Sequence, residues 1–127
     1  MDNEKIIIRD DLDIANCPVR NVLDRFGDKW SVLVMINLGN NGIMRFNELQ
    51  KSIPDISQKM LTATLRSLEA DGIVSRSVYA EVPPRVEYQL TELGETLLPH
   101  IRGLSQWAFT HMATILKNRA GKTDKDS

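Results

Sequence analysis

The segment from Ile56 to Gly72 constrains the fold more than any other, because it predicts one helix with two chemically different faces. Ser57 can accept a hydrogen bond from a first-turn amide that has no partner within the helix, so the helix should begin there. Gly72 suits the left-handed backbone that often follows a last turn. Three leucines with helical spacing mark the side that should be buried: Leu61, Leu65 and Leu68.

The opposite side of this helix carries small, polar and positively charged side chains. At about 100° per residue, it contains Lys59, Thr62, Ala63, Arg66 and Ala70. Such a face suits the floor of a DNA groove, and it equally suits an ordinary solvated surface. The flanking segments are therefore needed to choose between the two interpretations.

The residues before the helix predict a shorter helix and a tight turn. Residues 44–46 are long enough only for a small strand, and Asn47 is expected to cap a brief helix that ends at Ile53-Pro54. A turn at Asp55 then leads to Ser57. The order of helix, tight turn and helix is that of a helix-turn-helix unit.

The hydrophobic period changes after Gly72. Residues 73–79 are rich in β-formers, and residues 85–90 alternate cleanly between apolar and polar. Two prolines stiffen the tip between them. A two-stranded ribbon directly after the helix predicts a wing, whereas the plainer alternative is a pair of strands that only cover the core. We favour the wing because Arg76 and Arg85 lie near a rigid tip.

Two helices are expected in the N-terminal half. Cys17-Pro18 opens the first, because a proline at the first helical position loses no hydrogen bond. Its expected buried face consists of Val19, Val22, Leu23 and Phe26. Asp28 can cap the second helix, which is apolar almost all round and therefore belongs at the centre of the fold. The run from Gly39 to Gly42 is expected to end it.

Thr91 should cap a last helix of about residues 92–116, whose apolar stripe extends past the compact part of the domain. A long apolar helix on a small domain indicates a partner helix, most simply the same helix of a second copy. The expected dimer contacts are Leu97, Ile101, Leu104, Trp107 and Met112. Residues 117–127 are polar and are expected to be disordered.

Composition excludes several classes of function. The 127 residues are 42% hydrophobic, which suits one domain, and 16 basic residues stand against 17 acidic ones. DNA binding would therefore have to come from local placement of Lys and Arg rather than from net charge. One cysteine and the lack of a long apolar run favour a cytoplasmic protein without a membrane span. Because no catalytic set, phosphate loop or metal-ligand cluster occurs, neither enzymatic activity nor a cofactor or metal is expected.

Several motifs occur together in one order across roughly residues 15–110. They are Cys17-Pro18, Gly27-Asp28-Lys29-Trp30, Arg45-Phe46-Asn47-Glu48-Leu49, Ile56-Ser57-Gln58-Lys59-Met60-Leu61, Leu68-Glu69-Ala70-Asp71-Gly72-Ile73-Val74, Val82-Pro83-Pro84-Arg85-Val86-Glu87-Tyr88 and Leu90-Thr91-Glu92-Leu93-Gly94. With these motifs the chain resembles the HxlR-type family of bacterial winged-helix transcriptional regulators.

The resemblance implies a mainly helical α+β fold: a winged helix-turn-helix with a two- or three-stranded wing sheet and extra N- and C-terminal dimerisation helices. It also implies a homodimer with one wing per subunit and control of a nearby promoter. Residues 1–14 would then be an N-terminal arm, and residues 15–116 the winged-helix domain, with the wing at about residues 73–90.

In such a protein, the predicted DNA contacts fall into two groups. Ser57 and Gln58 lie at a helix N-terminus, which favours a phosphate, and the recognition-helix side chains able to reach base edges are Lys59, Thr62 and Arg66. Backbone or minor-groove contacts are predicted for Arg45, Arg76 and Arg85. A two-fold dimer predicts an inverted-repeat operator. The alternatives are that these are solubilising charges, and that the domain is a protein-interaction module without DNA binding.

Cys17 is the candidate thiol sensor. A helix N-terminus lowers the pKa of a thiol, so Cys17 before Pro18 can be a reactive thiolate. In several members of the family that the chain resembles, the matching cysteine senses oxidants or electrophiles. The alternative is a small buried apolar residue at a dimer interface. Since no second cysteine exists, oxidation would need the other subunit's thiol, a small-molecule thiol or a direct adduct.

Overall fold

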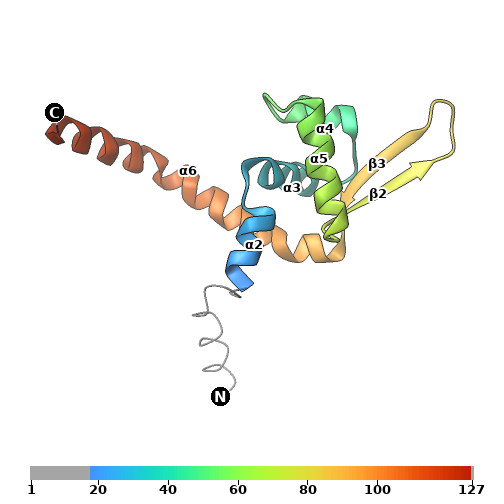
Figure 1. Ribbon diagram of the computed structural model, residues 1–127, viewed down its shortest axis with the longest axis horizontal. Coiled ribbons are helices and arrows are strands. Elements are labelled where there is room, and N and C mark those ends of the chain that lie inside the picture. Colours follow the sequence, from blue (N-terminus) through green and yellow to red (C-terminus); the bar gives the residue numbers. More distant parts are fainter. Residues whose placement is uncertain (1–17, 127) are drawn as a thin grey trace, which may run out of the picture.

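The computed structural model describes residues 18–126, and their side chains as far as residue 122. The elements in chain order are α2 (Pro18–Phe26), α3 (Lys29–Asn41), β1 (Met44–Arg45), α4 (Phe46–Ser52), α5 (Gln58–Ala70), β2 (Val74–Tyr79), β3 (Arg85–Leu90) and α6 (Glu92–Asp126). Figure 1 shows a helical body from which the β2–β3 ribbon projects on one side and the C-terminal half of α6 on the other. The expected N-terminal arm and Cys17 lie outside the described residues.

The core forms where α3, α5 and the sheet meet. Val34 and Met35 of α3 are fully buried, as are Leu61 and Leu65 of α5 to within 2%. Burial of these apolar side chains is the main favourable term in folding a domain of this size. The central position predicted for α3 and the leucine stripe predicted for α5 are therefore confirmed.

The helix-turn-helix unit comprises α4 and α5. The backbone amide of Arg45 donates to Glu48 Oε1 at 2.8 Å, so α4 begins directly after Arg45. The predicted cap at Asn47 is wrong, because the Glu48 carboxylate reaches back to an amide that the helix leaves unpaired. Asp55, with a φ of 69°, makes the turn between the two helices.

Both ends of α5 are closed as the sequence predicts. The amide of Met60 donates to Ser57 Oγ at 3.0 Å. At the other end Gly72 has a φ of 77°, its amide donates to the Glu69 carbonyl, and the Ile73 amide donates to the Leu68 carbonyl. This Schellman arrangement satisfies carbonyls that the last turn leaves free, and it turns the chain directly into β2.

The sheet has three antiparallel strands in the order β1-β3-β2, so β3 lies in the centre. Arg76 of β2 is directly opposite Tyr88 of β3, and Val78 is opposite Val86. A two- or three-stranded wing sheet was expected, and the structure has three strands. The winged helix-turn-helix prediction is confirmed with it.

The structure corrects the prediction for α2. Its expected buried face is open: Val19, Val22 and Leu23 are 56%, 42% and 61% exposed, and only Phe26 packs against the core. Apolar periodicity identifies the face of a helix that needs cover, but it does not say which chain supplies the cover. Within the described residues, nothing buries this face.

Helix α3 ends within the predicted run from Gly39 to Gly42: it runs through Gly39, and its last residue is Asn41. Gly39 lies against the side chain of Leu98 in α6, where a Cβ atom would meet the Leu98 methyl groups. Glycine is therefore used here for close packing of two helices and not as a stop. Gly42, with a φ of 77°, is the residue that ends the helix.

Helix α6 begins after Thr91, whose hydroxyl accepts from the Gly94 amide at 3.1 Å, and it continues to Asp126. Residues 117–126 are thus helical, in contrast to the predicted disordered tail. The segment contains no proline, and its Lys, Arg and Ala residues are good helix formers, so an established helix continues here although residues 117–122 are exposed. No helix of residues 18–126 is long and apolar enough to cross a membrane.

Candidate nucleic-acid interface

One side of α5 does not pack against the rest of the domain and borders a shallow depression. We call this side the outward face. It is lined by Ser57, Gln58, Lys59, Thr62, Ala63 and Arg66. Lys59 and Arg66 are exposed, while Thr62 is half-buried and donates to the Gln58 carbonyl at 2.8 Å. The structure thus brings the predicted recognition-helix residues together on one surface.

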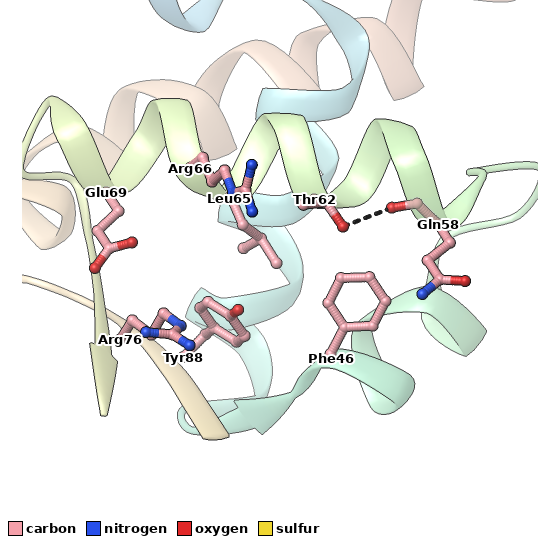
Figure 2. Close-up of a pocket in the computed structure, with 8 residues that line it drawn as sticks. All are labelled: Phe46, Gln58, Thr62, Leu65, Arg66, Glu69, Arg76 and Tyr88. Carbon is pink, nitrogen blue, oxygen red and sulfur yellow. Dashed lines mark hydrogen bonds between the residues drawn. The ribbon is translucent and has the colours of Figure 1, made fainter. Parts of the chain in front are cut away.

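A second hollow, the helix–sheet cleft, lies between α5 and the sheet and has a volume of about 390 Å³. It is lined by Phe46, Gln58, Thr62, Leu65, Arg66, Glu69, Arg76 and Tyr88. In Figure 2, Arg66 and Glu69 extend from α5 on one side, Arg76 and Tyr88 lie on the sheet side, and Phe46 closes the far end. Gln58, Thr62 and Arg66 line both hollows and connect them.

Arg76 reaches the cleft because of its strand register. Side chains alternate between the two faces of a strand, and Arg76 shares the face of its partner Tyr88, which is buried. Arg76 therefore lies between Val74 and Val78 on the face of β2 that borders the core. Neither Arg66 nor Arg76 forms an ion pair among the described residues.

Arg85 lies on the other face of the sheet and is already paired. Its guanidinium is 3.5 Å from Glu81 Oε1 and 3.5 Å from Glu87 Oε2, and it lies over the Tyr79 ring at 4.1 Å from the centroid. The sequence grouped Arg85 with Arg76 because both are close to the tip. The register separates them, and Arg85 has two local carboxylates to neutralise its charge.

Arg45 lies where β1 meets α4 and is exposed, outside both hollows. Four lining residues of the helix–sheet cleft were not predicted as site residues: Phe46, Leu65, Glu69 and Tyr88. Glu69 could have been found, because it continues the helical spacing of Gln58, Thr62 and Arg66 along α5. Tyr88 could not, since only strand pairing places it beside Arg76.

The apolar faces of α2 and α6 form a separate exposed surface. Leu104, Trp107 and Met112, three of the predicted dimer contacts, are exposed in the single chain, and Trp107 packs on the His111 ring at 4.5 Å between centroids. Leu97 and Ile101 instead pack against the core of their own domain. Two of the five expected dimer residues therefore have a role within the chain as well.

The fold and the outward face define a helix-turn-helix protein of the winged-helix class. Residues 25–115 match HxlR-like helix-turn-helix proteins, and the chain belongs to this family. It is a transcriptional regulator of the helix-turn-helix type. YdeP of Bacillus subtilis, an uncharacterized regulator of this type, is 44% identical over 114 residues, which cover 90% of this chain and 88% of YdeP.

Two similar solved structures concern redox chemistry. The redox regulator HypR in its oxidized form is 48% identical with a TM-score of 0.70, and the match covers 74% of this chain and 96% of HypR. Diamide-treated YodB from B. subtilis is 37% identical with a TM-score of 0.63, covering 74% of this chain and 93% of YodB. The predicted family is thereby confirmed.

Proposed function

We propose that this regulator binds double-stranded DNA as a homodimer, in the cytoplasm and without a catalytic step, at an inverted-repeat operator. The observation that supports this most is the outward face of α5. It presents Lys59 and Arg66 without ion-pair partners among the described residues, and the half-buried Thr62 lies between them.

In this proposal the outward face enters the major groove. An Arg or Lys that donates to guanine, or a Thr methyl group against thymine, each adds about 1–3 kcal/mol of discrimination. Ser57 and Gln58 lie at the N-terminus of α5, where free amides and the helix dipole favour a phosphate. Arg45 and Arg76 would contact the backbone, which supplies most of the affinity.

The second subunit would cover the exposed apolar faces of α2 and α6. Val22, Leu23, Leu104 and Trp107 are large apolar side chains left in solvent by the single chain. Their burial against the same surface of another copy would produce a two-fold axis. That axis predicts half-sites separated by about one helical turn of DNA, ~34 Å, or a multiple of it.

We further propose that oxidation or electrophile modification of Cys17 modulates DNA binding. Cys17 immediately precedes α2. The two similar structures, one of a redox regulator in its oxidized form and one of a diamide-treated protein, support this assignment by analogy. The partner thiol would be Cys17 of the other subunit or a small molecule.

DNA binding is tested by titrating the protein against its own upstream DNA at increasing salt. Selective binding should weaken along a steep line of log affinity against log salt. Arg66→Ala should lose about 1–3 kcal/mol at one site. Lys117→Ala removes the same charge from an exposed position on α6 and should have little effect. A protein-interaction module would show neither selectivity nor a difference between the two variants.

The role of Cys17 is tested by measuring operator affinity before and after diamide or quinone treatment. The parent protein should respond, and Cys17→Ala should bind the operator equally well with and without the oxidant. An equal response in both proteins would remove Cys17 from the proposal while leaving DNA binding intact.

A further inference from the structure

Glu69 is the acidic residue that lines the helix–sheet cleft, and no contact within the described part of the chain explains why a carboxylate lies there. It is exposed, it lines the cleft together with Arg66 and Arg76, and it forms no ion pair with either among the described residues. It also lies in the last turns of α5, where the helix dipole disfavours a carboxylate. Among the described residues, the structure therefore records no favourable contact of the Glu69 side chain.

Glu69 lies on the cleft side of the proposed recognition face: Thr62 and Arg66 line both hollows, whereas Glu69 borders the helix–sheet cleft and not the outward face. Lys59 shows the opposite arrangement, because it lines the outward face and not the cleft. Figure 2 shows Glu69 above Arg76, on the same side of α5 as Leu65. A carboxylate in this position lies closer to the sheet than Lys59 does, beside the two arginines of the cleft.

The cleft lies where a strand of DNA backbone would have to pass. In B-DNA, one sugar–phosphate strand separates the major groove from the neighbouring minor groove. If α5 occupies the major groove and the β2–β3 ribbon reaches toward the adjacent minor groove, this strand crosses between them. Arg66 from the helix and Arg76 from the sheet then approach the phosphates from two sides, and Glu69 lies beside the same site.

We propose that Glu69 weakens the binding of a backbone phosphate between Arg66 and Arg76 and so lowers the affinity for any duplex. This inference rests on the proposed DNA-binding function. Backbone contacts supply essentially all sequence-independent affinity. A carboxylate beside them therefore makes stable binding depend on the additional base contacts of an operator.

The test compares Glu69→Gln with Glu95→Gln, which removes the same charge from an exposed position in α6 that borders a different hollow. Each protein is titrated at low salt against the operator and against a random duplex of equal length. Glu69→Gln should bind both about fivefold more tightly, as expected for one like-charge contact at the DNA surface. Glu95→Gln should bind both as the parent does.

A second comparison tests whether the phosphate site is the cause. In an Arg76→Gln background, the phosphate is held less closely to the cleft. Glu69→Gln should then raise duplex affinity by clearly less than fivefold. If Glu69→Gln still raised DNA affinity fivefold in the Arg76→Gln background, the effect would be one of general charge, and the phosphate site proposed between Arg66 and Arg76 would be wrong. Unfolding curves in urea check that both variants are folded.

The remaining outcomes separate this inference from the proposed function. If Glu69→Gln loses operator affinity and leaves the random duplex unchanged, Glu69 reads a base and the inference fails, while DNA binding stands. If the parent shows no preference for an operator, both fail. If the parent is selective and Glu69→Gln binds both duplexes as the parent does, only the inference fails.

Discussion

Arg25 of α2 forms an ion pair with Asp71 at the C-terminal end of α5, with 2.8 Å between Nη1 and Oδ1. Helix α2 buries none of its own side chains fully. The pair therefore links the proposed DNA-contacting helix directly to the helix that follows Cys17.

The contribution of this pair to stability should be small. The two side chains are 57% and 22% exposed, so solvent screens their attraction. A double-mutant cycle of Arg25→Ala and Asp71→Ala, measured by urea unfolding, should give a coupling free energy below about 1 kcal/mol. The coupling should shrink further in high salt. A coupling above about 2 kcal/mol that salt leaves unchanged would contradict this assignment.

Two substitutions of Ser57 should affect folding stability and DNA affinity differently. Ser57→Ala removes the hydrogen bond from the Met60 amide and should cost about 1 kcal/mol of unfolding free energy. Ser57→Asp keeps a good cap, so stability should be close to that of the parent. It also adds a negative charge where we propose a phosphate, and operator affinity should fall. Equal DNA affinity for Ser57→Asp and the parent would place the DNA away from this helix end.

Two glycines of α6 should respond to alanine in opposite directions. A Cβ atom at Gly94 would overlap the carbonyl oxygen of Ile73, so Gly94→Ala should be destabilising by about 1–3 kcal/mol. A Cβ atom at Gly103, in the same helix, would have open space within 4 Å, and Gly103→Ala should raise the unfolding free energy by up to about 1 kcal/mol. Thermal unfolding of the two variants measures both effects.

If α6 forms the proposed dimer interface, a charge should break the dimer on one side of the helix and not on the other. Leu104→Glu places a charge on the exposed apolar stripe and should shift the protein toward monomer, because an unpaired charge cannot be buried cheaply in an interface. Gln106→Glu adds the same charge on the opposite side of the helix and should leave the dimer intact. Light scattering after size-exclusion chromatography reads the mass. Dissociation of both variants, or of neither, would place the interface elsewhere.

Much of the fold could be predicted from local rules. The cap at Ser57, the end of α5 at Gly72 and the leucine stripe between them are properties of a single helix, and all are confirmed. The prediction of Asn47 as a cap failed because α4 begins directly after Arg45, whose amide donates to the Glu48 carboxylate. The end predicted for α3 between Gly39 and Gly42 is confirmed, and a tertiary contact with Leu98 explains why Gly39 itself lies inside the helix.

The sequence by itself determined the order of helices and strands, the buried side of α5 and the family, since these depend on periodicity, caps and motif order along the chain. Only the tertiary structure decided that Arg76 and Glu69 share a cleft with Arg66, while Arg85 lies on the opposite face of the sheet. The reason is that strand register, which local sequence leaves open, decides to which face of the sheet each arginine points.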